Sequence, residues 1–475
     1  MTVINSELNG RASKSTAVGK CALISPPSNS LTQAPPVQLG YLASVLLRNG
    51  YDTRIFDFKR LDLNKEKLFA DLVAFKPDLI GISVITIEMP GTKRLVENIR
   101  KYMPCVKIVL GGVHPTVLPD ETLAETGADF IVRGEGEKII VNLANALFYY
   151  DQPLDGVRGI TFYDGGEIRS NPDESLIEDL DSIPYPAWEM IPPVFYSSYT
   201  MQLYKRRPVV ATILTSRGCP FGCSFCASRV HGKKIRYRSP ANVVSEMEML
   251  VRKYSVGEFM FLDDNFTMNK EHSLQICEEI IRRKLGIVWK MPQGMRADTV
   301  DEELIRYFKM AGCYEVGFGI ESGNQKILNR SKKRLDLSIV QNSIALIKKY
   351  DIEVYGFFIL GLPGENHKTV METIRFMRIG FDHISVSFCI PYPGSDIYNE
   401  YIKKNKRPDW SMFAHQHVFT GISDLSQQDL KQYMRRAILS FYLHPRRAFM
   451  LFRKIKSIPL KYTLRLILNY LWHGK

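Results

Sequence analysis

The sequence has no long hydrophobic run and no recognisable leader. None of its 475 residues belongs to a stretch of about 18 consecutive apolar residues, which argues against a membrane-spanning helix. The first residues also lack the apolar core of roughly 7–15 residues that a secretory signal peptide carries. From these two absences we expect a cytoplasmic protein, and from the length we expect two or three domains.

Cysteine is scarce. Eight residues in 475 are too few and too scattered for a secreted disulfide scaffold. Five of the eight stand alone in apolar surroundings, and we interpret them as buried thiols in a reducing compartment: Cys21, Cys105, Cys277, Cys313 and Cys389. The other three lie together in one loop, which makes that loop the most unusual feature of the chain.

Acidic residues are missing from the C-terminal end. From Leu430 to Lys475 there are eleven Lys or Arg and no Asp or Glu, so most of the net charge of +13 lies there. The rest of the chain is nearly neutral, which argues against a nucleic-acid-binding surface on the folded core. This basic amphipathic end could make a peripheral contact with an anionic membrane, or it could pack as a helical lid with a solvated face.

The cysteine loop has the spacing C-x-x-x-C-x-x-C. Cys219, Cys223 and Cys226 are set among glycines and a proline that allow tight turns. Thiolates this close in sequence hold zinc or an iron–sulfur cluster. Structural zinc takes four protein ligands, and no fourth Cys or His occurs before His231. Three thiolates on a cubane cluster leave one iron free for catalysis, and the alternative is three buried cysteines in an ordinary loop.

Residues 1–17 are polar and unpatterned, and we expect them to be disordered. Over residues 18–152, short β-type runs alternate with amphipathic helical patterns, as in a doubly wound parallel sheet. The expected strands are Ala22–Ser25, Thr53–Phe58, Leu79–Ile85, Lys107–Gly111 and Phe130–Val132. This pattern predicts a flavodoxin-like domain whose ligand lies at the carboxyl ends of the strands. The alternative is such a sheet that binds a nucleotide or nothing.

Small and polar residues follow three of these strands. They are Ser83 and Thr86 after the third, Gly111, Gly112, His114 and Thr116 after the fourth, and Glu135 after the fifth. Paired glycines let a large flat ligand approach the backbone, and hydroxyl groups can bond its periphery. The region resembles a cobalamin-binding domain, which carries a D-x-H-x-x-G loop, then S-x-L, then G-G. The resemblance implies that these seven residues contact cobalamin.

The resemblance is incomplete at the first loop. Asp57 is present, but Lys59 stands where the cobalt-ligating His would be, and Asp62 replaces the glycine. We therefore expect that no histidine of this loop holds the lower face of the cobalt. His114 is a candidate substitute, and the alternative for it is a turn residue bonded to the backbone.

Residues 153–204 have the pattern of a connection. Gly159–Tyr163 and Glu167–Ser170 flank Asp164-Gly-Gly, which predicts a β-hairpin. The Pro-rich passage from Ile183 to Pro193 predicts an extended linker, and we place the domain boundary in this region.

A second strand–helix series occupies residues 205–415, and a basic helical segment follows over residues 416–475. The expected strands are Val209–Thr215, Glu258–Asp263, Ile287–Met291, Glu315–Ile320, Glu353–Leu360 and His383–Ile390. Six βα units predict a partial (β/α)6 barrel with its active site at the carboxyl ends of the strands, where the cysteine loop lies. We expect the turn Tyr392–Ser395 to border the substrate opening.

This second region resembles the radical S-adenosylmethionine (SAM) superfamily in its cysteine motif and in the barrel behind it. The resemblance implies that Cys219, Cys223 and Cys226 ligate one 4Fe–4S cluster, whose open iron binds SAM and whose electron cleaves it to a 5′-deoxyadenosyl radical. Polar residues at the other strand ends are the candidate SAM contacts: Asp263, Asp264, Arg296, Glu321, Ser322 and Gly361. We expect Arg296 on the methionine carboxylate and Glu321 on the ribose. For the two aspartates, Arg296 and Glu321, the alternative is a helix cap or a solvated loop.

Together the two resemblances predict a cobalamin-dependent radical SAM enzyme, a methyltransferase that moves a methyl group from methylcobalamin to an unactivated carbon of a small or lipid-like molecule. They imply a 4Fe–4S cluster, SAM and cobalamin as cofactors, and a flavodoxin or ferredoxin as electron donor. The alternatives are an enzyme that closes or rearranges a ring without methyl transfer, and a cobalamin-binding sensor with an inert barrel. A methylthiotransferase is disfavoured, because only Cys21 and Cys105 lie upstream of the loop.

Overall fold

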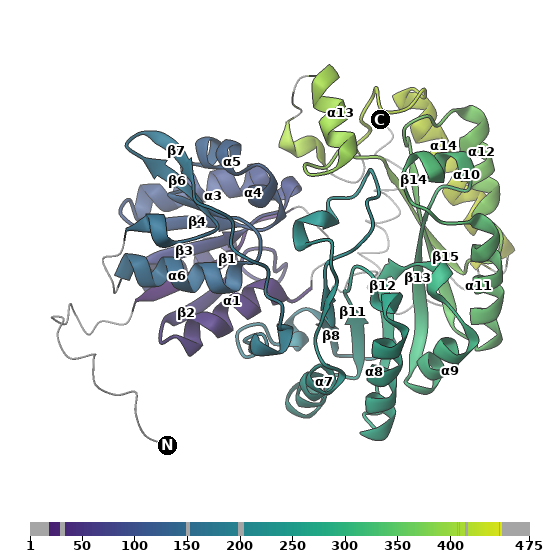
Figure 1. Ribbon diagram of the computed structural model, residues 1–475, viewed down its shortest axis with the longest axis horizontal. Coiled ribbons are helices and arrows are strands. Elements are labelled where there is room, and N and C mark those ends of the chain that lie inside the picture. The colour runs from purple at the N-terminus through teal and green to yellow at the C-terminus, as the bar shows by residue number, and fades with distance from the viewer. Residues whose placement is uncertain are drawn as a thin grey trace.

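The computed structural model of the chain describes residues 19–28, 34–148, 153–197, 204–405, 407, 409–413, 417–445 and 447–448. Two α/β bodies lie side by side (Figure 1). The N-terminal body, purple to blue, is a sheet with helices on both faces, and the second body, teal to green, is an open barrel with helices outside. The α/β fold class expected from the sequence is confirmed.

The first sheet has seven strands in the order β2-β1-β3-β4-β5-β6-β7. Its parallel part consists of β1 (Lys20–Ser25), β2 (Asp52–Asp57), β3 (Leu79–Ser83), β4 (Lys107–Gly111) and β5 (Phe130–Val132). The order 2-1-3-4-5 is that of flavodoxin-like folds, which bind ligands where the strand order reverses. The carboxyl ends of β1, β3 and β4 therefore form the expected ligand-binding edge.

Helices cover both faces of this sheet, and each face has its own apolar core. They are α1 (Val37–Arg48), α2 (Lys65–Phe75), α3 (Met89–Tyr102), α4 (Val113–Val117), α5 (Pro119–Thr126) and α6 (Gly136–Phe148). One core packs α1 and α6 against Leu23 and Val109, and the other packs α2 and α3 against Ile24 and Ile108. Burial of both faces explains why the central strands β1, β3 and β4 are mostly apolar, whereas the edge strand β2 carries exposed polar residues.

The predicted hairpin forms, but it is part of this sheet. β6 (Ile160–Asp164) pairs antiparallel with β5, and β7 (Glu167–Ser170) pairs with β6 at the edge. The Pro-rich passage that follows is tied to both bodies. The Ala187 N–H donates to the Gly40 carbonyl of α1 at 3.0 Å, and the Trp188 indole donates to Glu246 Oε1 of the barrel at 2.8 Å.

The second sheet has six parallel strands in the order β15-β14-β13-β12-β11-β8. Its strands are β8 (Val210–Ile213), β11 (Glu258–Phe261), β12 (Val288–Met295), β13 (Cys313–Glu321), β14 (Glu353–Leu360) and β15 (His383–Phe388). The predicted partial barrel is confirmed. In β14 buried residues alternate with half-buried ones, since one face packs on helices and the other faces the barrel interior.

The barrel helices connect successive strands and lie on the outer surface (Figure 1). They are α7 (Pro240–Tyr254), α8 (Lys270–Arg282), α9 (Glu302–Met310), α10 (Gln325–Arg330), α11 (Leu337–Lys349) and α12 (His367–Phe376). Most begin at a side-chain cap. Ser239, for example, accepts from the Asn242 N–H, and Asp301 accepts from the Leu304 N–H.

The chain after β15 returns to the first body. It contains α13 (Asp396–Lys404), a short 3-10 turn (Trp410–Phe413) and α14 (Gln427–Tyr442). Trp410, Phe413 and Phe419 join the apolar core of the first body beside Ile82 and Val84. The C-terminal segment therefore joins the two bodies a second time.

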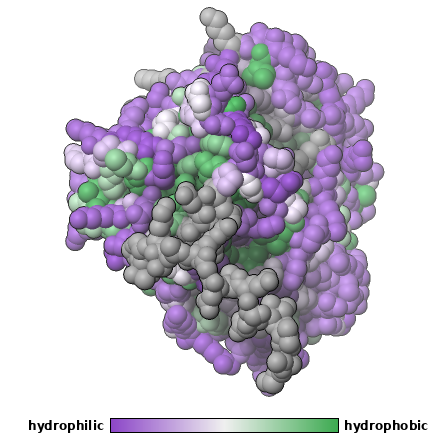
Figure 2. Space-filling view, turned by 60° about the vertical axis from the view of Figure 1, so that its left-hand side comes forward, coloured by the Kyte–Doolittle hydropathy of each residue, from purple (hydrophilic) through white to green (hydrophobic). Residues whose placement is uncertain are grey.

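The predicted membrane contact of the basic C-terminal end lies outside the described residues, apart from its first part up to residue 448. Within the described residues, no helix is both long and apolar enough to cross a membrane. Figure 2 shows a mostly hydrophilic surface on the face that it presents, with hydrophobic side chains in separate patches.

Candidate active site

The cysteine loop lies after β8, at the carboxyl end of the barrel strands. Its base is a small antiparallel pair, β9 (Ser216–Arg217) with β10 (Arg236–Tyr237). Further in, the Cys219 N–H donates to the Gly232 carbonyl at 3.2 Å, and the Ser224 N–H donates to the Ser331 carbonyl at 3.0 Å. These bonds hold the loop to itself and to the segment after β13.

The three thiols of the loop are half-buried and free of disulfides. Burial raises the pKa of both Cys219 and Cys223. Tetrahedral zinc would bring its sulfur ligands to about 3.8 Å from one another. Among the described residues, the three ligand atoms of His, Cys, Asp or Glu that lie within 4.8 Å of one another belong to another group. Three free thiols on one loop, with no fourth Cys or His before His231, fit a cubane cluster with one open iron.

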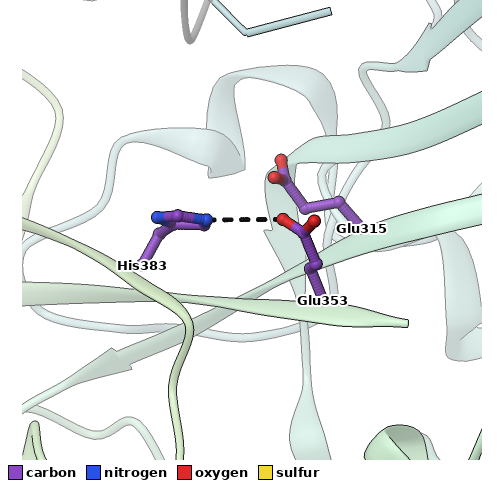
Figure 3. A group of neighbouring side chains, drawn as sticks. All are labelled: Glu315, Glu353 and His383. Carbon is purple, nitrogen blue, oxygen red and sulfur yellow. Dashed lines mark ion pairs between the residues drawn. The ribbon is translucent and has the colours of Figure 1, made fainter. Parts of the chain in front are cut away.

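That other group is Glu315, Glu353 and His383, at the amino ends of β13, β14 and β15 (Figure 3). His383 Nε2 lies 3.3 Å from Glu353 Oε2. Two cations of the chain already balance the carboxylates, because Lys290 Nζ lies 3.9 Å from Glu315 and Arg206 lies 3.3 Å from Glu353. The group lies at the opposite end of the strands from the cysteine loop, and we interpret it as a buried ionic network of the barrel.

Glu321, the predicted ribose contact, lies at the end of β13 beside the cysteine loop. It has φ +70°, and its Oε1 accepts from Lys333 Nζ at 2.9 Å. A Cβ at Gly319 would lie 2.8 Å from that carboxylate and 3.0 Å from the ammonium, so the glycine leaves room for the pair. The Lys333 charge lowers the pKa of Cys223, which burial raises.

Sequence reasoning missed Lys333. It lies in the run Lys332-Lys333-Arg334, which has the composition of an exposed basic turn. In the structure its side chain is nearly buried, and it lies near the Phe225 ring of the cysteine loop. Burial alone would lower the pKa of Lys333, but Glu321 and Cys223 raise it above its ordinary value. A cation is therefore held at the cysteine loop.

The two adjacent aspartates after β11 have different environments. Asp263 is buried, and its Oδ1 accepts from the Thr215 N–H at 3.0 Å, the Thr215 hydroxyl at 2.8 Å and the Ser216 hydroxyl at 2.5 Å. That carboxylate fixes the corner between β8 and β9. Asp264 is exposed, and its charge lies close enough to Cys219 to raise the pKa of that thiol. Of the two aspartates, Asp264 is therefore the better placed to contact a ligand.

Arg296 has a full set of protein partners. Its guanidinium is bidentate to Asp298 at 2.9 and 2.6 Å and donates to the carbonyls of Lys333 and Arg334 at 2.8 and 2.6 Å. It also lies over the Phe221 ring, 4.1 Å from the centroid. Through Phe221, Arg296 joins the cysteine loop to the segment at Lys333 and Arg334. These contacts differ from the predicted pairing with a methionine carboxylate.

The two remaining SAM candidates lie in fixed backbone. Ser322 is fully buried, with its hydroxyl 3.1 Å from that of Thr373. Gly361 has φ +89°, and its N–H donates to Glu365 Oε2 at 2.6 Å. Cys389 is buried beside Leu362 and Ile397, in agreement with the core interpretation.

The predicted cobalamin contacts Ser83, Gly111 and Gly112 come together at the edge of the first sheet. Gly112 has φ +100°, and a Cβ there would lie 2.7 Å from the Val84 carbonyl oxygen and 2.9 Å from its nitrogen. The Thr116 hydroxyl donates to the Gly112 carbonyl at 2.7 Å and accepts from Gly134 at 3.0 Å, which ties together the loops after β4 and β5. This glycine-walled edge fits the close approach of a large flat ligand.

Neither His114 nor Lys59 is presented as a free ligand. His114 is 1% exposed, its Nδ1 lies 3.1 Å from the Thr86 hydroxyl, and its ring meets Trp410 edge-on. Burial and the nearby Arg407 charge lower the pKa of His114 to about 4. Lys59 forms an ion pair with the buried Glu88. The His114 ring bonds a side-chain hydroxyl, and its Nε2 is buried without a hydrogen-bond partner among the described residues, so the ring is not bonded to the backbone as the alternative expected.

Glu135 was predicted to contact cobalamin, and the structure gives its carboxylate other partners. Its oxygens accept from Arg236 at 2.7 and 2.9 Å, from Arg217 at 3.2 Å and from the Ile177 N–H at 2.8 Å. Arg217 also pairs with Glu137 at 2.6 Å. Because both arginines lie in the β9–β10 pair, this buried network joins the first body to the base of the cysteine loop.

Two family models match the chain. Residues 28–144 match the B12 binding domain, and residues 213–377 match the Radical SAM superfamily. An uncharacterized methyltransferase of Pyrococcus horikoshii is 31% identical over 441 residues, which cover 90% of this chain and 94% of the relative. The anaerobic magnesium-protoporphyrin IX monomethyl ester cyclase of Rubrivivax gelatinosus is 32% identical over 77% of this chain, which spans 66% of that protein.

Another relative and two solved structures extend this likeness. The cytidylyl-2-hydroxyethylphosphonate methyltransferase of Streptomyces wedmorensis is 28% identical, and the match covers 78% of each chain. The cobalamin-dependent SAM radical enzyme OxsB superposes with a TM-score of 0.73 at 17% identity, over 93% of this chain and 71% of its own. The radical SAM methyltransferase TsrM of Kitasatospora setae superposes with a TM-score of 0.67 at 20% identity, over 82% and 75%. At these identities the superpositions show a shared two-domain fold.

Proposed function

This chain belongs to the radical SAM enzymes that carry an N-terminal B12-binding domain, and on that premise we propose that it is a cobalamin-dependent methyltransferase. The observation that carries the proposal is the ionic network of Glu135, Arg217 and Arg236, which fixes the B12-binding domain against the cysteine loop. A buried ionic network between the two domains would hold both cofactors in fixed positions around one substrate.

The residues divide between the cofactors as follows. Cys219, Cys223 and Cys226 would hold the 4Fe–4S cluster, and Glu321, Asp264 and the backbone at Gly361 would hold SAM, with Lys333 as a further cation beside them. Ser83, Thr86, Gly111, Gly112 and Thr116 would surround cobalamin at the sheet edge. When bound, these groups supply a 5′-deoxyadenosyl radical for hydrogen removal and a methyl group for transfer. The chain's own task is to orient them and to keep water away.

The names of several relatives support methyl transfer to a small molecule. Two of the relatives named above are methyltransferases, and further ones in Chlorobaculum tepidum are named as bacteriochlorophyllide d methyltransferases. We therefore propose a small-molecule substrate. The cyclase relatives favour a second candidate, ring closure without methyl transfer.

A product analysis distinguishes the two candidates. Protein reconstituted anaerobically with iron, sulfide and cobalamin would be incubated with SAM and a low-potential reductant. A methyltransferase forms both 5′-deoxyadenosine and S-adenosylhomocysteine, whereas a cyclase forms the first alone. We expect both products, and 5′-deoxyadenosine without any S-adenosylhomocysteine would contradict the methyltransferase proposal.

The cluster has its own test. Cys223→Ala should bind fewer irons than the roughly four of a full cluster and form no 5′-deoxyadenosine. Cys105→Ala is the matched control, because Cys105, which we expected from the sequence to be buried, is exposed and lies outside the loop. Equal iron content in the two variants would contradict the assignment. In the cell we propose that a flavodoxin or ferredoxin supplies the electron.

A further inference from the structure

We propose that the turn Tyr392–Ser395 sets the distance between the two cofactor-binding domains and that Gly394 is its positioning residue. The inference rests on the proposed function, because it concerns how the B12-binding domain and the barrel face each other. The turn follows β15 at the carboxyl end of the barrel and leads into α13.

Gly394 lies at a three-way contact. Its φ is +88°, and a Cβ there would lie 2.9 Å from Val117 Cγ1 and 3.5 Å from Ala227 Cβ. Val117 is the last residue of α4, the helix that begins directly after Gly112 at the sheet edge. Ala227 follows Cys226 in the cysteine loop. One glycine thus lies against both cofactor-binding loops.

The turn itself is held firmly. The Ser395 N–H and hydroxyl both donate to the Tyr392 carbonyl, at 3.0 and 2.7 Å. The Ser395 hydroxyl also accepts from the Tyr398 N–H at 3.1 Å and so caps α13. One residue before, the Ile397 N–H donates to the Ser224 carbonyl of the cysteine loop at 3.0 Å. The turn is therefore hydrogen-bonded to the cysteine loop, and Ile390 and Tyr398 on either side of it pack in the apolar core of the first body. Its contact with α4 is the van der Waals contact of Gly394 with Val117.

Added bulk at position 394 would separate the domains. Val117 is β-branched, so its side chain has little freedom to rotate away from a carbon at 2.9 Å. We expect the clash between this carbon and Val117 to be relieved by a shift of α4, together with the Gly112 loop, away from the cysteine loop. A displacement of about 1 Å costs about a hundredfold in rate when two reacting groups must meet. The rate should therefore fall for the step that needs both domains, and it should change little for the steps that need only one domain.

Methyl transfer from SAM to protein-bound cobalamin is such a step, and it needs no substrate. With titanium(III) citrate as the reductant, cobalamin bound at the Gly111-Gly112 edge would accept a methyl group from SAM bound at the cysteine loop, and S-adenosylhomocysteine would be the other product. Two other measurements report on single domains: 5′-deoxyadenosine formation on the barrel, and cobalamin content on the B12-binding domain.

The variant is Gly394→Ala, and its matched control is Gly421→Ala. Gly421 has φ +83° but nothing within 4 Å of a Cβ, so both variants share the backbone strain and only the first meets Val117. We expect methyl transfer in Gly394→Ala to be at least about tenfold slower than in the control. Cobalamin content and 5′-deoxyadenosine formation should stay within about twofold of the control, because each depends on one domain.

A second substitution tests the contact itself. Val117→Ala removes the carbon that Gly394→Ala would meet, so the double variant should recover transfer to within about threefold of wild type. Hydrogen exchange in the protein without cofactors gives an independent measure of spacing. Residues 113–117 and 223–231 should exchange faster in Gly394→Ala than in Gly421→Ala, and the double variant should restore their protection.

Three outcomes would overturn the inference: equal transfer rates in the two glycine variants, a parallel loss of all three activities in Gly394→Ala, or no recovery in the double variant. A wild-type protein that forms neither 5′-deoxyadenosine nor S-adenosylhomocysteine would instead contradict the proposed function. In that case hydrogen exchange still decides whether Gly394 sets the spacing.

Discussion

Lys333 Nζ lies 2.9 Å from Glu321 Oε1, and the pair lies beside Cys223 of the cysteine loop. Both side chains are nearly buried, at 12% and 10% exposure. Removing one partner of such a pair leaves the other charge unpaired in a low-dielectric site, which costs more than losing a surface ion pair. The pair therefore joins the end of β13 to the turn after α10, next to the cysteine loop. It should control how the site receives an anionic ligand group.

Lys333→Met should impair SAM cleavage. The substitution removes the cation beside Glu321 and Cys223, and we expect 5′-deoxyadenosine formation to fall at least tenfold, which corresponds to about 1.4 kcal/mol. The measurement is the rate per iron bound, so that a loss of cluster is counted separately. Lys332→Met is the control, because Lys332 is exposed and pairs with Asp396 at the surface. Equal rates in the two variants would contradict a role for Lys333.

Glu135→Gln should loosen the joint between the domains. It removes the charge that Arg217 and Arg236 share, and breaking a buried pair in this way costs about 3–5 kcal/mol. Glu178→Gln is the control, because Glu178 forms an exposed pair with Lys234 that should contribute about 0.2–1 kcal/mol. Urea denaturation of the cofactor-free proteins measures the loss of stability in each of the two variants. A change in the Glu135→Gln midpoint no larger than that of the control would contradict the ionic joint.

The pH dependence of the same joint has a definite sign. Burial alone would raise the pKa of Glu135, but the hydrogen bonds from Arg236 and Ile177 and the Arg217 charge lower it below its ordinary value. Its contribution is therefore present above the unfolded pKa of about 4.3 and is lost as the pH falls through the folded pKa. Wild type should lose stability on acidification in this window relative to Glu135→Gln. If the difference in unfolding free energy between the two proteins stays constant from pH 6 to pH 3, the lowered pKa of Glu135 would be contradicted.

Gly112→Ala should reduce cobalamin binding. The substitution adds a Cβ at φ +100°, 2.7 Å from the Val84 carbonyl, so the loop after β4 must move. Gly50→Ala is the matched control in the same domain, because Gly50 has φ +87° and nothing within 4 Å. Equilibrium dialysis with cobalamin, followed by its absorbance, should show at least tenfold weaker retention in Gly112→Ala. Equal retention in both would place cobalamin elsewhere.

Much of the architecture could be predicted, because hydrophobic runs report burial directly. β4, β5 and β14 have the bounds that the sequence predicts, and both sheets have the expected parallel strands. The strand ends placed the cysteine loop and the Gly111-Gly112 loop at the correct edges. These predictions depend on local patterns, which a single sequence contains.

The partners of individual charged residues could not be predicted. Glu135 pairs with Arg217 and Arg236, which lie 82 and 101 residues away. Arg296 donates hydrogen bonds to two backbone carbonyls after β13, and the residues next to Arg296 in the sequence do not indicate these partners. Lys333 was missed for the same reason, since a basic run has the same composition whether it is exposed or faces a buried glutamate. Periodicity shows which face is buried, but it does not show which distant side chain lies opposite.

Glu365→Gln should remove a pH dependence from the stability of the barrel. Glu365 Oε2 accepts from the Gly361 and Leu362 N–H groups, Oε1 is buried without a partner among the described residues, and burial raises the pKa of the carboxyl to about 7. The folded state therefore keeps this proton up to about pH 7, whereas the unfolded chain releases it near 4.3. Stability should fall as the pH rises through this window, by about 1.4 kcal/mol per pH unit at most.

A glutamine keeps the acceptor for both N–H groups and cannot ionise. The difference in unfolding free energy between Glu365→Gln and wild type should then grow in favour of the variant from pH 5 to pH 7 and stay constant above it. Urea denaturation of the cofactor-free proteins at pH 5, 6, 7 and 8 measures that difference. A difference that does not change with pH would show that the folded protein holds Glu365 ionised, and the loop after β14 would then need a cation beside it.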